Sequence, residues 1–278
     1  MTIKAQGVLS FELSESGLPS GNYRIAGSFS KGAYLEKPGG GLIMLHDDHW
    51  GNIPFGIAVS DCEKVLKSAD IKESSKASVS DGKLLVLGRA SEVEISLARR
   101  EKALGKSQKP CGEEAFIKVA EEKLHFSHNG VLKNLVSDDF PETAYCITAK
   151  KLINGRDIQD ALADILGLGP GLTPSGDDLA CGYIYYTLRC GKPDEKTKLC
   201  IKRILEVMRK LTTAVSCEFL SAAASGAKVT LFDGVCFAKD KEALEKAIDR
   251  LLMMGSNSGA DVLCGMLLAA KQILRKRL

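Results

Sequence analysis

The chain has 278 residues, of which 45% are hydrophobic and 26% are charged, and this composition excludes a disordered or low-complexity protein. Its 38 lysines and arginines nearly balance 35 aspartates and glutamates, and a net charge of +3 argues against a protein that binds the nucleic-acid backbone. No apolar run reaches the length of about 18 residues that spans a bilayer. The nine cysteines form no CxxC pair, so we expect no disulfide framework. Together with the balanced charge and the lack of a long apolar run, this predicts a soluble, cytoplasmic protein without membrane or nucleic-acid partners.

The first half of the chain has the pattern of short β-strands interrupted by one helix. Two pairs of strand candidates flank Asp81-Gly82 and Asn129-Gly130, dipeptides that are typical of type I′ hairpins. A helix is predicted over Glu113–Glu122 from apolar residues at helical spacing. The strand candidates in chain order are Gly41–Leu45, Ile53–Val59, Lys76–Ser80, Lys83–Leu87, Glu92–Ala98, Leu124–Ser127 and Val131–Leu135. We interpret residues 1–148 as an antiparallel, β-rich domain that is barrel- or sandwich-like.

Beyond residue 148 the pattern changes to apolar residues at three- and four-residue spacing, which predicts amphipathic helices. The predicted helices are Asp157–Leu166, Ser175–Cys190, Glu195–Leu211, Thr213–Ser225, Lys241–Met253 and Ser258–Leu278. Residues 149–278 therefore form a predicted helical domain. The fold class is α+β, with the β-rich part first.

The most informative segment is the loop Gly167–Asp178, GLGPGLTPSGDD, which leads into a predicted helix. Its glycines and prolines impose an unusual backbone, and a helix N-terminus offers N–H groups and a dipole that favour an anion. A Walker A loop starting at Gly171 requires lysine where this chain has Asp177. A dinucleotide fingerprint requires glycine at position 172 or 174, which are Leu172 and Pro174. The loop therefore matches neither of these two nucleotide-binding motifs.

Part of the loop recurs 83 residues later. The segment Ser175–Gly182, SGDDLACG, aligns with Ser258–Gly265, SGADVLCG. A serine N-cap with an acidic residue three positions on is a capping box, which accounts for Asp178 and Asp261 as structural residues. Cys181 and Cys264 lie more than a turn into their helices, so we expect buried packing residues there.

Capping does not explain the glycines at the end of each copy. Gly182 and Gly265 lie inside the predicted helices, where glycine costs about 1 kcal/mol relative to alanine. We therefore expect the two helices to cross at these glycines and to bring their N-termini together. Asp177, whose counterpart is Ala260, is then an extra carboxylate beside an anion site. It would serve as a base, a metal ligand or an acceptor for an amide NH₂ group.

These considerations give a set of candidate site residues, with no metal and no cofactor predicted. Asp177 and Asp178 are the predicted catalytic residues. The predicted ligand-binding residues are Gly169, Gly171, Thr173, Ser175, Gly176, Ser216, Ser258, Gly259 and Asp261. The histidine pairs at 46 and 49 and at 125 and 128 resemble metal ligands, but we interpret them as loop and turn residues.

The Gly167–Asp178 loop with Leu179 and Gly182 resembles the signature of a family that includes the AllH-type subunit of oxamate carbamoyltransferase. The later segment Gly255–Gly265 and the helix Thr213–Gly226 are also similar to this family, and Gly41–Gly56 is a fainter trace of it. The resemblance implies a role in allantoin catabolism, in which oxalurate and phosphate give oxamate and carbamoyl phosphate. It implies a small anionic substrate (phosphate, carbamoyl phosphate or an oxalurate-like compound) and assembly with other carbamoyltransferase subunits or with copies of itself.

Three functions are compatible with the sequence. The first is a carbamoyltransferase subunit that binds a phosphate-type anion at the paired helix N-termini. The second is a non-catalytic scaffold or regulatory subunit whose loops only cap helices. The third is a Mg²⁺-dependent hydrolase that uses Asp177 and Asp178 as ligands, although adjacent residues at a helix start point about 100° apart.

Overall fold

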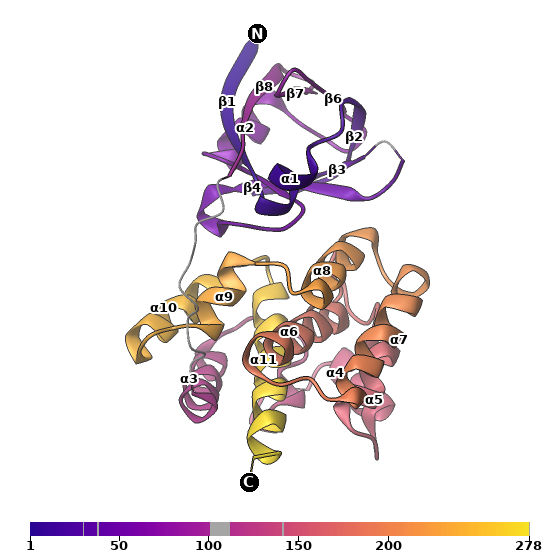
Figure 1. Ribbon diagram of the computed structural model, residues 1–278, viewed down its shortest axis with the longest axis vertical. Helices are drawn as coiled ribbons and strands as arrows, with labels where there is room; N and C mark the ends of the chain where they lie inside the picture. The colour runs from indigo at the N-terminus through magenta and orange to yellow at the C-terminus, as the bar shows by residue number, and fades with distance from the viewer. Residues whose placement is uncertain (30, 38, 101–111, 141, 278) are drawn as a thin grey trace. The chain divides into compact units, whose positions relative to one another are not determined.

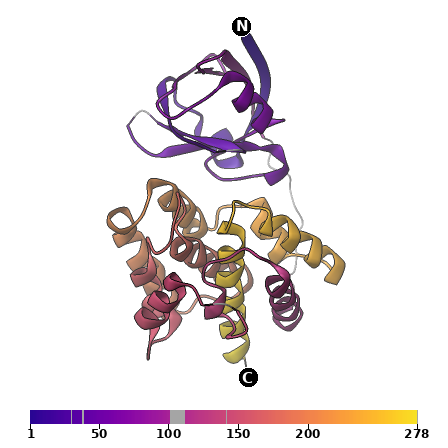
Figure 2. The same ribbon diagram turned by 180° about the vertical axis from the view of Figure 1, so that it is seen from behind.

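The protein is described by a computed structural model that covers residues 1–278 except 30, 38, 101–111, 141 and 278. The chain forms two compact units (Figure 1; Figure 2 shows them from behind). The first comprises Met1–Lys106 and Lys228–Thr230, and the second comprises Ser107–Ala227 and Leu231–Leu278. The change of unit thus falls earlier in the chain than residue 148, because α3 (Glu113–Phe126) already belongs to the helical unit.

The first unit is a closed eight-stranded barrel in the order β1-β5-β4-β3-β2-β6-β7-β8. Six strand pairs are antiparallel, whereas β1 pairs with β8 and β4 with β5 in parallel. The strands are β1 (Thr2–Leu9), β2 (Gly21–Phe29), β3 (Gly32–Glu36), β4 (Leu42–Asp47), β5 (Gly56–Val59), β6 (Lys76–Ser80), β7 (Lys83–Leu87) and β8 (Glu92–Ala98). Two helices, α1 (Phe11–Ser16) and α2 (Cys62–Ala69), and a 3₁₀ turn, η1 (Asp48–Trp50), accompany them. The predicted α+β class and the barrel are confirmed.

The hairpin between β6 and β7 forms as its sequence predicts. Ser80 pairs with Lys83, and Asp81 and Gly82 between them have φ angles of 49° and 70°. Positive φ at both positions is what a type I′ turn requires, and it is why this dipeptide identifies the hairpin. Along both strands alternate residues are buried in the barrel core, as the period of two predicts.

The second predicted hairpin, around Asn129-Gly130, is wrong. Leu124 belongs to α3, because the apolar stripe that begins at Phe116 continues to Leu124. The helix ends at Phe126, and the turn dipeptide follows it, with a φ of 103° at Gly130. The chain then enters a 3₁₀ turn, η2 (Lys133–Leu135), rather than a strand.

The helical unit agrees with the predicted helices closely, and those that carry the paired motifs begin at the predicted serines. Its elements are α3, η2, α4 (Ala144–Ile153), α5 (Ile158–Ala161), η3 (Leu162–Ile165), α6 (Ser175–Cys190), α7 (Glu195–Leu211), α8 (Ala214–Ser225), α9 (Thr230–Cys236), α10 (Lys241–Leu252) and α11 (Ser258–Arg275). Helices α4 and α9 were not predicted as such. None of the described helices is both long and apolar enough to cross a bilayer.

Candidate functional site

Helices α6 and α11 cross backbone against backbone inside the helical unit (Figure 1). A Cβ atom at Gly182 would lie 2.1 Å from the Val262 carbonyl oxygen, and one at Gly265 would lie 1.9 Å from the Leu179 carbonyl oxygen. Carbon and oxygen atoms cannot approach so closely, so glycine is required on both helices. The crossing predicted from the two interior glycines is confirmed.

The crossing brings the two Gly-Asp segments together. The hydroxyl of Thr173, in the loop before α6, is 2.8 Å from the hydroxyl of Ser258, the first residue of α11. Ser258 also lies in hydrogen-bonding contact with Asp178 of α6, and Ser175 of α6 lies in such contact with Asp261 of α11. Each serine therefore faces the aspartate of the opposite helix.

This exchange corrects the capping-box interpretation. The N-cap residues are Pro174 and Asn257, so Ser175 and Ser258 are the first residues inside the helices, and no side-chain cap bond forms at either N-terminus. Proline at position 174 has the extended backbone that an N-cap needs, which moves the serine one position into the helix. The spacing of serine and aspartate thus serves contacts between the two helices and not within each one.

The helix N-terminal N–H groups predicted to hold an anion are engaged by backbone carbonyls. Gly176 donates to Leu168 at 2.8 Å, and Gly259 donates to Met254 at 2.9 Å. A Cβ atom at either glycine would lie 1.9 Å from a backbone oxygen, of Ile165 in the first case and of Leu251 in the second. These two glycines therefore allow close packing. Gly169 and Gly171, with φ of 122° and 95°, shape the loop itself.

Asp177 holds the loop against the junction of α7 and α8. It is 2% exposed and accepts a hydrogen bond from the Gly167 N–H at 2.8 Å and another from the Thr212 hydroxyl. Burial raises the pKa of this carboxyl group, and the hydrogen bonds offset the effect in part. Both carboxylate oxygens are therefore occupied by the protein itself.

Asp261 plays a comparable part on the other side of the crossing. It is fully buried, and its Oδ1 atom accepts hydrogen bonds from the N–H groups of Val131 and Leu132, both at 2.9 Å. Its Oδ2 atom has no hydrogen-bond partner among the described residues. Burial raises the pKa of Asp261 to about 6, although these N–H groups and the Lys133 ammonium act in the opposite direction. Lys133 is a nearby cation that the sequence did not indicate.

The raised pKa of Asp261 predicts that the helical unit loses stability as the pH rises. The folded state holds this proton up to about pH 6, whereas the unfolded chain releases it near 3.8, so the contribution is present at low pH and is lost through pH 6. We expect Asp261 to lower the free energy of unfolding, followed by helical circular dichroism, by about 1 kcal/mol between pH 5 and pH 7. Asp261→Asn, whose oxygen can still accept both N–H groups, should reduce the difference by about this amount, and the raised pKa values of Asp177 and Asp178 account for what remains. An unchanged pH slope in the variant would assign it to other carboxyl groups.

Asp178 is the third carboxyl group at the crossing, and its hydrogen-bond partners are of a different kind. It is 6% exposed, and no backbone N–H of a described residue is bonded to its side chain. Burial raises its pKa well above the usual value, and the charges of Asp261 and Asp177 act in the same direction. The hydroxyls of Ser258 and Thr173 offset this in part. Asp178 is thus a buried carboxyl group whose partners are rotatable hydroxyls.

Helix α8 contributes a third N-terminus next to the loop. Its N-cap residue Thr213 accepts a hydrogen bond from the Ser216 N–H at 3.1 Å and donates one to the Leu172 carbonyl at 2.6 Å. Ser216 is 1% exposed and lies beside Asp177, yet its hydroxyl has no well-formed hydrogen bond to a described residue. The structure therefore brings Ser216 to the site, as predicted.

Cys181 and Cys264 are buried inside the helices that cross at this site. Both are buried, and burial raises the pKa of both thiols. A protonated, inaccessible thiol is a poor nucleophile. The interpretation of these residues as packing residues is confirmed.

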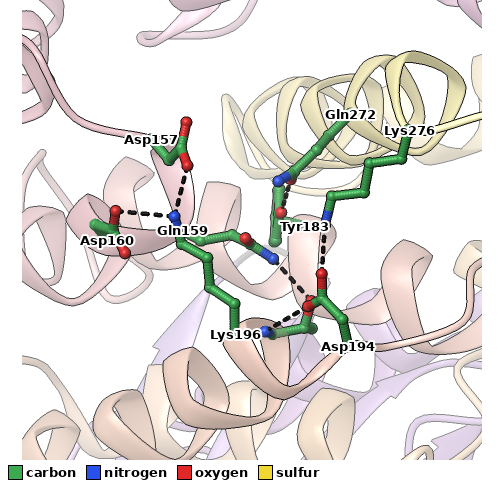
Figure 3. Close-up of polar contacts among 9 residues, drawn as sticks. Asp157, Gln159, Asp160, Tyr183, Asp194, Lys196, Gln272 and Lys276 are labelled. Atoms are coloured by element: carbon green, nitrogen blue, oxygen red, sulfur yellow. Dashed lines mark hydrogen bonds and ion pairs between the residues drawn. The ribbon is translucent and has the colours of Figure 1, made fainter. Parts of the chain in front are cut away.

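A second polar cluster was not anticipated from the sequence, and it joins α5, α6, α7 and α11 (Figure 3). Asp194 caps α7 and accepts a hydrogen bond from the Lys276 ammonium at 2.6 Å. Gln159 donates to Thr197 at 2.7 Å, and the Tyr183 hydroxyl donates to Gln272. Because these partners belong to four helices of one unit, the cluster is explained as a structural network.

The histidines are placed differently from the prediction. His46 was interpreted as a loop residue, but it is a buried residue of β4 that is stacked on Trp50. Asp47, Asp48 and His49 do place three possible ligand atoms within 4.8 Å of one another at the surface. Asp47 caps the turn η1 and contacts His49, which gives this group a structural explanation.

Residues 165–270 match the family model described as oxamate carbamoyltransferase subunit AllH. The match includes both Gly-Asp segments, the crossing glycines, α8 and the described site residues of the helical unit from Gly167 onward. The resemblance stated from the loop sequence is therefore confirmed over this part of the chain. No solved structure matches the chain. The helical unit is thus similar to a subunit associated with carbamoyl transfer.

Proposed function

We propose that the chain is a subunit of an oxamate carbamoyltransferase-like enzyme and that the crossing of α6 and α11 carries its substrate site. The match over residues 165–270 is the observation that supports this proposal most strongly. In the reaction, a phosphate oxygen attacks the ureido carbonyl carbon of oxalurate and the bond from that carbon to the oxamate nitrogen breaks. The nitrogen takes a proton, so the products are carbamoyl phosphate and oxamate.

The surroundings of Asp178 support a role in binding the carbamoyl end of the substrate. A reaction of this kind needs positioning and stabilisation of charge on the carbonyl oxygen more than a covalent nucleophile. The hydroxyl groups of Thr173 and Ser258 lie against Asp178, the Ser216 hydroxyl lies against Asp177, and all three can donate hydrogen bonds. The phosphate-type anion that we expected at the helix N-termini is less well supported, because N–H groups of both helices already bind carbonyls.

The alternative roles of Asp177 are also less well supported. A shared Mg²⁺ ion would require its carboxylate to leave Gly167 and Thr212. Among the described residues, Asp177 and Asp178 do not belong to a group of three close metal ligands. A scaffold role remains the second candidate, since Asp177 and Asp261 both hold loops in place.

A subunit of a transferase is tested best inside the assembled enzyme. We expect this chain, co-expressed with the products of its neighbouring genes, to form a complex that converts oxalurate and phosphate into carbamoyl phosphate, followed by ³¹P NMR. Asp178→Ala should leave assembly intact and reduce kcat at least about 100-fold. A complex that retains full activity with this variant would favour the scaffold role. A complex that is equally active without the chain would contradict the proposal.

A further inference from the structure

The three carboxyl groups at the crossing are not equivalent, and the difference indicates which of them meets a ligand. Asp177 and Asp261 are each anchored by backbone N–H groups, which cannot leave without moving the chain. Asp178 is instead covered by the hydroxyls of Thr173 and Ser258, which are hydrogen-bonded to each other at 2.8 Å. Both covering residues are partly exposed, whereas Asp178 itself is buried.

The protonation state of Asp178 follows from the groups that face it. Asp261 on α11 and Asp177 on its own helix are carboxyl groups, and Cys181 on the next turn is a buried thiol. Together with burial, the two carboxylates raise the pKa of Asp178, and the hydroxyls of Thr173 and Ser258 only moderate the effect. Asp178 therefore holds its proton to a higher pH than an exposed aspartate does.

A neutral carboxyl group has one O–H donor and one carbonyl acceptor side by side. A primary amide has the complementary pair, a carbonyl acceptor and an N–H donor, whereas a carboxylate offers no donor, and both a carboxylate and phosphate add negative charge. The buried Oδ2 atom of Asp261, whose carboxyl group acts electrostatically on Asp178, has no well-formed hydrogen bond to a described residue although Ser175 lies near it, and it is a further acceptor. An NH₂ group carries two N–H donors, so it can donate to both the acceptor oxygen of Asp178 and the Oδ2 atom of Asp261.

Resting on the function proposed above, we propose that Asp178 binds the –CO–NH₂ group of the substrate through two hydrogen bonds. The carboxyl O–H donates to the carbonyl oxygen, and the other carboxyl oxygen accepts from the NH₂ group. The hydrogen bond between Thr173 and Ser258 opens to admit the ligand. Donation to the carbonyl oxygen also polarises the carbon that phosphate attacks, so Asp178 would be a catalytic residue that selects for carbamoyl groups.

The test compares ligands that differ at this one group, by calorimetry on the full chain. Carbamoyl phosphate carries the –CO–NH₂ group that is transferred, acetyl phosphate has a methyl group in place of its NH₂ group, and inorganic phosphate lacks the acyl group. We expect carbamoyl phosphate to bind at least about tenfold more tightly than acetyl phosphate or phosphate at pH 6. Its affinity should fall as the pH is raised and Asp178 loses its proton.

Two variants make the test specific. Asp178→Asn keeps a donor and an acceptor in the same place but does not titrate, so it should bind carbamoyl phosphate equally at pH 6 and pH 9. Asp249→Asn, which changes a surface aspartate on α10, is the matched control and should behave like the unaltered chain. Absence of carbamoyl phosphate binding, equal binding of acetyl phosphate, or the same pH dependence in Asp178→Asn would each overturn the inference.

The outcome is separable from that of the proposed function. Carbamoyl transfer by the assembled complex without selectivity for the amide would overturn this inference alone. Selective, Asp178-dependent binding of carbamoyl phosphate by a chain whose complex transfers no carbamoyl group would support this inference and contradict the proposed reaction.

Discussion

Replacing Gly265 with alanine is expected to destabilise the helical unit by about 3 kcal/mol, although alanine is the better helix former. The added Cβ atom would lie 1.9 Å from the Leu179 carbonyl oxygen, which belongs to the backbone of α6 and cannot rotate away. The two helices must separate, and the packing of buried side chains along both is then lost. Gly182→Ala meets the Val262 carbonyl in the same way and should have a similar effect.

Thermal unfolding followed by circular dichroism measures this effect directly. For a unit of this size a loss of about 3 kcal/mol lowers Tm by about 6 to 12 °C. Gly234→Ala in α9 is the matched control, because a Cβ atom there would lie 3.6 Å from the Ala247 Cβ atom, an ordinary contact. It should leave Tm unchanged or raise it. Equal behaviour of the three variants would show that the crossing tolerates wider spacing and is not set by its glycines.

The crossing of α6 and α11 was predictable from sequence because the free-energy cost of a glycine inside a helix depends on the helix itself and not on distant residues. A glycine inside a helix is unfavourable wherever the helix lies, so Gly182 and Gly265 at equal depth in two similar segments need a packing reason. Matching depth on two helices indicates mutual contact. The same logic located the hairpin at Asp81-Gly82, since positive φ is a property of the dipeptide itself.

The roles of the aspartates were not predictable in the same way, because their partners are distant in the chain. A serine followed three residues later by an aspartate fits a capping box as well as an exchange between two helices. The bonds from Gly167 and Thr212 to Asp177, and from Val131 to Asp261, depend on loops whose positions follow only from the whole fold. Asp177 was emphasised because it lacks a counterpart at Ala260, whereas in the structure it is Asp178 whose side chain is bonded to no backbone N–H group of a described residue.

Closure of the barrel also could not be predicted from the sequence patterns of its separate strands. Strand β1 has alternating exposure that its sequence could have indicated, with Leu9 on the buried face. Its parallel pairing with β8 joins Thr2 to Glu92 and follows from neither segment alone. Short elements such as α9 were missed because seven residues that include Gly234 give a weak helical pattern.

Acidification is expected to destabilise the barrel through His46. This side chain is 1% exposed, and burial lowers its pKa from 6.5 to about 4. Its Nδ1 atom lies 2.9 Å from the Asp47 carbonyl oxygen, which requires a proton on that nitrogen. The Nε2 atom faces Gly56, where even a Cβ atom would lie 2.5 Å from it, so a second proton and its hydration shell have no room.

The sign follows from which state binds the proton first. The unfolded chain protonates this histidine near pH 6.5, whereas the folded barrel resists until about pH 4, so its stability is greatest above 6.5 and falls as the pH drops. Between pH 7 and pH 5 the loss should be about 2 kcal/mol. Because the buried Asp261 gives the opposite slope, the two units should respond in opposite directions over this range.

Trp50 makes this expectation measurable for the barrel alone, since it is the one tryptophan in the sequence and stacks on His46 with a ring separation of 6.1 Å. Denaturant unfolding followed by tryptophan fluorescence should show the loss between pH 7 and pH 5, above the range in which exposed carboxyl groups titrate. His46→Phe keeps an aromatic ring against Trp50 and removes the titration, so its stability at the barrel should be nearly constant over the same range. If the variant shows the slope of the unaltered chain, other groups in the barrel carry the pH dependence and His46 does not.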